Sequence, residues 1–253
     1  MESESDKSPP PSQSRRSICD NCNRPLPVCL CHVIPASPIP TATQIIIVKH
    51  PHESHHKLNT TPLLTKSLVN ATSIISRKLK PNLHPLLADD KPSPATFYLF
   101  PPTPSSPAIT LSELKNSITK FRNAETGPLV LIAIDATWKH AKEMVSASEG
   151  YLTKFATRVC LDGFDKEMEG GSIYDSELVL RKEPCGGCVS TVEAVARWLG
   201  AVEENGPEIE ARLIGVLRET VRLQAQFLKP MKPRPKMLKK GKQEEKSSEK
   251  SFG

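Results

Sequence analysis

The chain has 253 residues and a formal net charge of +6, and this length suffices for one or two domains with a sizeable core. Only 5% of the residues are aromatic and 24 are proline, so we expect part of the chain to lie outside a folded core. No apolar run reaches the roughly 18 residues that a membrane span needs, and residues 1–16 lack the apolar centre of a secretory signal. These features argue against a secreted or membrane-bound protein and predict one of the cytoplasm, the nucleus or both.

The two ends of the chain are polar, and we expect both to be disordered tails. Residues 1–17 are mostly Ser, Pro and charged residues, and residues 230–253 are rich in Lys. From Lys229 to Gly253, nine Lys or Arg stand against three Glu, an excess that equals the net charge of the whole chain. Such a tail suits an anionic polymer partner or a nuclear import signal, and a tail that is only solvated fits equally well.

Four cysteines open the folded part, within residues 18–36. Two residues separate Cys19 from Cys22, and one residue separates Cys29 from Cys31. Clustered thiols in a reducing compartment favour metal binding over disulfides, and four thiolates suit a tetrahedral zinc ion. We therefore predict a small zinc element of structural role, because four cysteines leave no coordination position open for a catalytic water. Free thiols, or a cluster of cysteines that arises by chance, are the alternatives.

The first strand is expected at residues 43–48, where branched apolar residues follow one another. It leads into a loop that contains Glu53 and, between His50 and His56, four of the seven histidines. Spacings of one or two residues in a loop with proline do not favour a histidine triad for metal. We expect a polar, partly positive loop near a ligand, followed by a helix that starts near residues 59–62.

The middle of the chain contains the segment that we expect at the centre of the fold. After a proline-rich stretch with a short strand at 97–100 and a helix at 111–121, residues 129–134 form an unbroken apolar run. A short run of branched residues is typical of a strand buried on both faces of a parallel sheet. Asp135 then stands at the carboxyl end, where open α/β sheets place their ligands, unless it only caps the following helix.

The last part of the chain continues the alternation of strands and helices. Strands are expected at 157–161 and 178–180, and the box formed by Ser190 and Glu193 opens a further helix. The amides at that helix start also favour an anionic group such as a carboxylate. Alternation without repeats predicts an α/β fold with a mostly parallel sheet flanked by helices. The pair Cys185 and Cys188, with two glycines between, fits a redox or metal pair and a flexible loop equally well.

Five motifs, taken in order, resemble the DTW-domain family, whose members are tRNA-uridine aminocarboxypropyltransferases placed near the SPOUT class of S-adenosylmethionine enzymes. Together the motifs span residues 18–229 and leave only the two tails uncovered. They are the cysteine cluster with Arg24-Pro25, His50-Pro51-x-Glu53, Asp135-x-Thr137-Trp138, Leu180-Arg181-Lys182 and Ser190-Thr191-Val192-Glu193-Ala194.

The resemblance implies a DTW catalytic domain over residues 37–229 with a SPOUT-like sheet, whose carboxyl end can be knotted. It implies transfer of the 3-amino-3-carboxypropyl group from S-adenosylmethionine to N3 of a tRNA uridine, with methylthioadenosine as the second product. The partner implied is tRNA, and a homodimer is left open, as many SPOUT-like enzymes dimerise.

The same resemblance implies roles for individual residues. Asp135 would accept or orient the N3 proton of uridine, with Thr137 beside it, and Trp138 would stack on uracil or adenine unless it is a core residue. Arg181 would hold a carboxylate or a phosphate. The donor site would comprise Leu180, Arg181, Ser190, Thr191 and Glu193, and the RNA contacts His50, Glu53 and Lys139.

Two other functions fit the same sequence. A SPOUT-like sheet serves methyl transfer equally well, so an S-adenosylmethionine-dependent RNA methyltransferase, which releases adenosylhomocysteine, is the nearest alternative. The other is a non-catalytic zinc-containing RNA-binding adaptor that uses the basic tail, in which Asp135 is structural. A nucleotide hydrolase is not favoured, because the sequence has no GxxxxGK[ST] phosphate loop.

Overall fold

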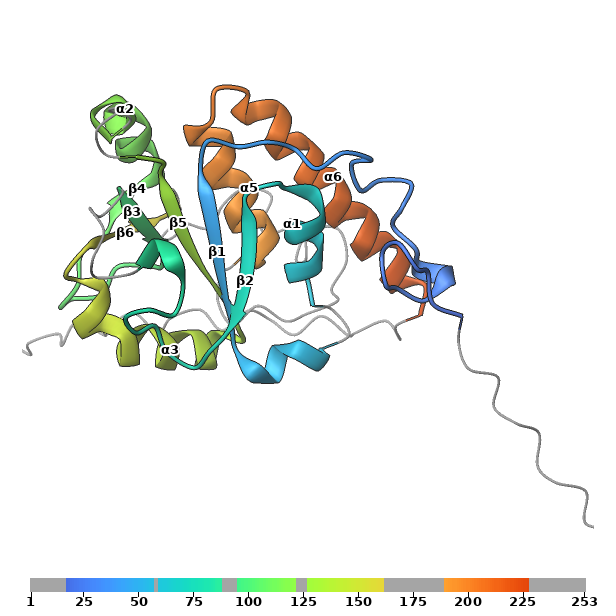
Figure 1. Ribbon diagram of the computed structural model, residues 1–253, viewed down its shortest axis with the longest axis horizontal. Coiled ribbons are helices and arrows are strands. Elements are labelled where there is room, and N and C mark those ends of the chain that lie inside the picture. The colour runs from blue at the N-terminus through green and yellow to red at the C-terminus, as the bar shows by residue number, and fades with distance from the viewer. Residues whose placement is uncertain (1–16, 57–58, 88–94, 122–126, 162–188, 228–253) are drawn as a thin grey trace, which may run out of the picture.

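The computed structural model describes residues 17–56, 59–87, 95–121, 127–161 and 189–227. Within these residues, six strands form one sheet in the order β2-β1-β5-β3-β6-β4, and every neighbouring pair is parallel (Figure 1). The predicted α/β fold with a parallel sheet is confirmed. The strands are β1 (Gln44–Lys49), β2 (Ala71–Ile75), β3 (Thr96–Leu99), β4 (Ile109–Thr110), β5 (Val130–Asp135) and β6 (Ala156–Cys160).

Five α-helices and three short 3-10 helices accompany the sheet in the described parts of the chain. Of these helices, none combines the length and apolar character needed to cross a membrane. The α-helices are α1 (Thr61–Ser67), α2 (Leu111–Phe121), α3 (Trp138–Leu152), α5 (Thr191–Val202) and α6 (Gly206–Ala225), and the 3-10 helices are η1 (Leu26–Val28), η2 (Pro51–His55) and η3 (Pro85–Leu87).

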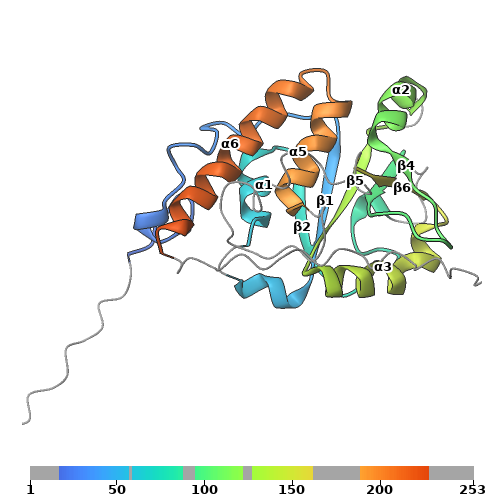
Figure 2. The ribbon, with the colours of Figure 1, turned by 180° about the vertical axis from the view of Figure 1, so that it is seen from behind.

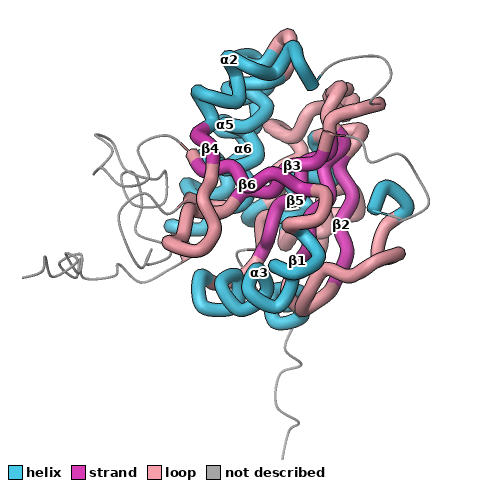
Figure 3. Tube along the Cα trace, turned by 90° about the vertical axis from the view of Figure 1, so that its left-hand side faces the viewer, coloured by secondary structure: helices cyan, strands magenta, loops and turns pink. Residues whose placement is uncertain are grey.

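Helices cover both faces of the sheet, because the central strands are apolar on both sides. Along β1, Ile45 and Ile47 pack on the face that carries α1, α2, α5 and α6, whereas Ile46 and Val48 pack on the face that carries α3. This alternation follows from the two-residue period of a strand. Figures 2 and 3 show α5 and α6 side by side, with the strands between them and α3. The core therefore has two halves, one on each face of the sheet.

The predicted elements agree with the observed ones within a few residues where both can be compared. The central strand ends at Asp135 itself, and α5 continues to Val202. The strand β2 was not predicted, because Ala71–Ile75 is polar at its centre and leaves most of its side chains exposed. It lies at the edge of the sheet with a single strand partner, so it needs no apolar run on both faces.

The cysteine-rich element packs against α1 and α6. The Lys66 ammonium, near the end of α1, donates to the carbonyl oxygen of Asn21 at 2.6 Å. His32 Nε2 lies 2.8 Å from the Glu219 carboxylate of α6, which Arg222 also binds at 2.7 Å. These polar contacts add to apolar packing, because Val28 and Leu30 of the same element are buried in the core that α1 and α6 also form.

Several predictions fall outside the described residues. They concern the tails predicted at 1–17, apart from residue 17, and at 230–253, the strand at 178–180, and the side chains of Leu180, Arg181, Cys185 and Cys188.

Candidate active site at the carboxyl ends of the central strands

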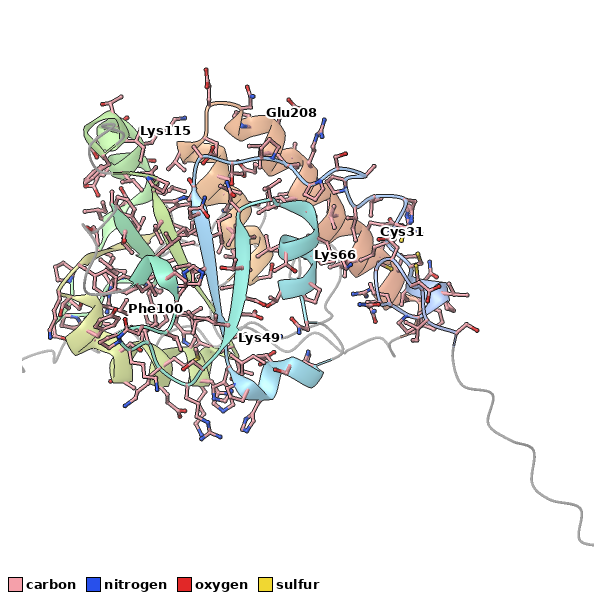
Figure 4. The ribbon with its side chains drawn as sticks, viewed as in Figure 1. Cys31, Lys49, Lys66, Phe100, Lys115 and Glu208 are labelled. Carbon is pink, nitrogen blue, oxygen red and sulfur yellow. The ribbon has the colours of Figure 1, made fainter. Side chains whose placement is uncertain are left out.

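The carboxyl ends of β1 and β5 meet at one edge of the sheet. These strands are parallel neighbours, and Lys49 opposite Asp135 is the last pair of their register. The chain leaves β1 through His50, whose amide donates to the Asp135 carbonyl oxygen at 2.9 Å. Figure 4 labels Lys49 at this lower edge of the sheet. Because ligands of open α/β sheets bind beyond the carboxyl ends of the strands, this edge is the place where a site is expected.

The carboxylate of Asp135 is held by two hydroxyl groups from different helices. Thr61 at the start of α1 donates to Oδ2, and Thr191 in the first turn of α5 donates to Oδ1 at 2.8 Å. Asp135 is 8% exposed, so its orientation is fixed within the protein. A carboxylate offers about four acceptor positions, which leaves room for a ligand beside the two threonines.

The cap of α3 is Thr137 rather than Asp135. The Thr137 hydroxyl accepts from the His140 amide at 3.4 Å and lies 3.1 Å from His140 Nδ1. The alternative in which Asp135 only caps this helix is therefore wrong. In the short segment between β5 and α3, Thr137 caps the helix, whereas Asp135 binds Thr61 and Thr191.

Three imidazole rings gather at the same edge. His50 stacks on His140 of α3 with ring centroids 4.1 Å apart, and His52 meets both rings edge-on. Burial, His140 and His52 lower the pKa of His50 below its ordinary value of 6.5. The His50 ring is therefore neutral at pH 7, and its Nδ1 accepts from the His52 amide at 3.3 Å.

One face of the Trp138 ring is covered by Phe100. The two rings stack with centroids 5.4 Å apart and an angle of 14° between their planes. The Arg158 guanidinium lies 5.7 Å from the centre of the Phe100 ring and is itself held by the Glu149 carboxylate at 2.8 Å. Trp138 is half-buried, so it stands at the margin of the core.

The other described residues of the predicted site have separate surroundings. Ser190 caps α5 by accepting from the Glu193 amide at 3.2 Å, which confirms the predicted helix start. The Glu193 carboxylate is fully buried and binds Arg197 at 2.6 Å. Glu53 is buried within η2, whereas Lys139 is exposed on the first turn of α3.

The four cysteines of the amino-terminal element bring their sulfur atoms together. Cys19 Sγ lies 3.5 Å from Cys31 Sγ, and Cys22 Sγ lies 3.7 Å from Cys29 Sγ. Zinc bound to four thiolates at about 2.3 Å places the sulfurs roughly 3.8 Å apart, whereas a disulfide needs about 2 Å. The sulfur positions therefore fit one tetrahedral ion. Figure 4 labels Cys31 beside α6, apart from the edge that Lys49 marks.

Hydrogen bonding within this cluster favours mixed protonation of its thiols. The backbone amides of Cys22 and Asn21 and the thiol of Cys31 lower the pKa of Cys19 to about 6, and the contact with Cys19 raises the pKa of Cys31 to about 12. One thiolate at neutral pH is available as a first ligand, since the thiolate is the form that binds metal.

Three side chains of this edge were not predicted from the sequence: Thr61, His140 and Phe100. Each lies next to a recognised motif or element. The residue that it contacts in the site, however, is 38 or more positions away in the chain. The only local signal is that His140 follows Thr137 by three residues, the spacing of one helical turn.

Comparisons with known proteins agree with the motifs. Residues 16–225 match the family described as the DTW domain. The chain is 59% identical over 245 residues to tRNA-uridine aminocarboxypropyltransferase A of Arabidopsis thaliana, covering 95% of this chain and 91% of the relative. It is 31% identical over 214 residues to tRNA-uridine aminocarboxypropyltransferase 2 of Drosophila melanogaster, covering 83% and 76% of the two chains. No solved structure shows significant similarity. The chain belongs to the DTW-domain family.

Proposed function

We propose that this protein transfers the 3-amino-3-carboxypropyl group of S-adenosylmethionine to N3 of a uridine in tRNA. Membership of the DTW-domain family and relatives named tRNA-uridine aminocarboxypropyltransferases support a transferase that modifies tRNA. The observation that carries the proposal is the Asp135 carboxylate at the carboxyl edge of the sheet, held by Thr61 and Thr191 with acceptor positions to spare.

The reaction makes a specific demand on this carboxylate. The bond between uridine N3 and the γ-carbon of the donor forms, the bond between that carbon and sulfur breaks, and methylthioadenosine leaves as a neutral thioether. N3 carries a proton and is a poor nucleophile while neutral, so a base beside it lowers the barrier. Asp135 takes this proton directly or through one water, while the two threonine hydroxyls keep its orientation.

Aromatic and cationic groups complete the proposed site. Trp138, supported from behind by Phe100, provides a flat wall for uracil or adenine. The start of α5 at Ser190 and Thr191 suits the carboxylate of the donor, and Arg181 adds a guanidinium for the same group or for a phosphate. For RNA we propose Lys139, which is exposed, together with the loop of His50 and Glu53 and the basic carboxyl-terminal tail.

We further propose that Cys19, Cys22, Cys29 and Cys31 bind a structural zinc ion. The sulfur spacing fits a tetrahedral ion, and all four thiols come from one small element. The ion takes no part in the transfer, because a sulfonium leaves without metal assistance and four thiolates close the coordination sphere.

The function is tested by product analysis with matched variants. Purified protein is incubated with S-adenosylmethionine and uridine-containing tRNA, and both the tRNA nucleosides and the small-molecule products are identified by mass spectrometry. We expect aminocarboxypropyl-uridine and methylthioadenosine in equal amounts, and at least a ~100-fold lower rate for Asp135→Asn, the range that a lost acid–base group costs. Glu208→Gln, an exposed change on α6 at the opposite side of the molecule in Figure 4, is the control. Full activity of Asp135→Asn would show that Asp135 is not the base. Adenosylhomocysteine as the product would show that the protein transfers a methyl group instead.

A further inference from the structure

The three histidines beside the proposed active site form a cluster that the transfer reaction does not use as a unit. His50 follows β1, His52 lies in η2 two residues later, and His140 comes from the first turn of α3. One ring nitrogen of each lies within 4.8 Å of one ring nitrogen of the others. The spacing of His50 and His52 alone does not make a metal site, and the third imidazole is supplied by the fold.

The three rings can reach one ion after a modest movement of their side chains. Tetrahedral coordination with nitrogen ligands at about 2.0–2.1 Å places the ligand nitrogens roughly 3.4 Å apart. The widest separation in the cluster therefore has to shrink by about 1.4 Å at most. His52 is exposed and His140 is half-buried, so both rings have room to turn, and the stack of His50 on His140 opens as they do.

The chemistry of the rings also suits a metal. Imidazole is the commonest metal ligand among protein side chains, and it suits ions such as zinc, copper, iron and nickel. His140 Nδ1 lies 3.1 Å from the Thr137 hydroxyl, a contact of the kind that orients metal-bound histidines through their second nitrogen.

We propose that His50, His52 and His140 form a second metal site, distinct from the cysteine cluster, for a divalent first-row ion of the zinc class. Three histidines leave a coordination position open, and the site adjoins the Asp135 backbone through the His50 amide. An anionic oxygen of a substrate, such as a carboxylate or a phosphate, is the ligand that the open position takes. The metal site does not depend on the proposed transfer reaction, because its ligands are present whatever the chain modifies.

The test uses Co²⁺ as the probe, because its absorption distinguishes thiolate from imidazole ligands. Full-length protein, stripped of metal, is titrated with Co²⁺ while bound metal and thiolate-to-cobalt charge transfer are recorded. We expect the protein to bind two equivalents of Co²⁺. The cysteines bind one, which produces the charge-transfer band, and the histidines bind the other, which adds nothing to that band. The double variant His52→Gln with His140→Gln should weaken that equivalent at least ~10-fold, since losing even an outer-shell partner costs about that much.

Two variants separate this outcome from a loss of folding. His84→Gln changes a half-buried histidine outside the cluster, bound to Thr72 at 3.2 Å, and should leave both equivalents in place. His52→Gln alone changes an exposed ring and should weaken the imidazole equivalent while the thiolate band stays intact. The proposal is overturned if wild-type protein binds Co²⁺ only with thiolate charge transfer, or if the imidazole equivalent survives the double variant unchanged.

Discussion

Thr191 and Asp135 are 56 positions apart in the chain, and the hydroxyl of the first donates to the carboxylate of the second at 2.8 Å. This bond joins the start of α5 to the end of β5. With the matching bond from Thr61, it gathers three segments of the chain around one carboxylate. The proposed base is thus oriented by hydroxyl groups at the starts of two helices, and one of them, Thr191, also belongs to the proposed donor site.

Thr191→Val tests this arrangement. Valine keeps the shape of threonine and removes the donor, and a hydrogen bond to a charged group is worth about 1.5–3 kcal/mol. We expect a loss of unfolding free energy in that range in urea, together with a lower kcat because Asp135 is less well oriented. Thr191→Ser, which keeps the hydroxyl, is the matched control. Equal kcat for the valine variant and the wild type would show that this bond has no part in the reaction.

The stack of Phe100 on Trp138 predicts a fluorescence signal for ligand binding. The chain has two tryptophans, and Trp198 is fully buried, so Trp198→Phe leaves Trp138 as the one indole. In this variant we expect S-adenosylmethionine or uridine to change the emission, because a base stacks against the half-buried ring. Phe100→Leu should raise KM more than it lowers kcat, since the wall for the base becomes mobile. If no ligand changes the emission, Trp138 does not contact the ligand and serves only to pack at the edge of the core.

Removal of zinc should destabilise the amino-terminal element without stopping the chemistry. Metal binding contributes folding free energy directly, so Cys22→Ser is expected to cost about 2 kcal/mol or more, or roughly 4–8 °C in Tm for a chain of this size. Hydrogen exchange should show lost protection for residues 18–34. The folded fraction should keep its kcat, and Cys160→Ser, a change outside the cluster, is the control. Purified protein without stoichiometric zinc would contradict the assignment.

Acid should weaken the ionic contacts of Glu219, which binds Arg222 within α6 and His32 of the cysteine-rich element. Arg222, and then His32, lower the pKa of Glu219 from 4.5 to about 2. A carboxylate whose pKa is lower in the folded state stabilises the fold above its unfolded pKa, and this contribution is lost as the pH falls from about 4.5 towards 2. Glu219→Gln should therefore be less stable than wild type at pH 6, with a difference that shrinks at pH 3. A difference that stays constant with pH would contradict this account.

The fold was predictable where burial or capping of an element requires particular residue types. The apolar run of β5 and the capping box of α5 can be recognised in the sequence, because a strand buried on both faces and a helix start each need particular residue types. The edge strand β2 (Ala71–Ile75) was not predicted, because a strand at an exposed edge does not need such a residue pattern.

The site was predictable only where a single segment carries the signal. Asp135 follows a buried strand, and Thr191 belongs to a recognised helix start, so both could be named in advance. Thr61 and His140 could not, because a threonine near a helix start and a histidine on a helix are ordinary by themselves. Their importance comes from contacts with Asp135 and His50, which only the packed chain brings about.

The most direct measurement of the central claim follows two labels of one donor molecule. S-adenosylmethionine labelled with ¹⁴C in the carboxyl group and ³H in the methyl group is incubated with tRNA and the purified protein. We predict that ¹⁴C enters the tRNA in a form that nuclease digestion releases as modified uridine, and that ³H leaves entirely in methylthioadenosine. Incorporation of ³H into the tRNA, or of neither label, would contradict the account.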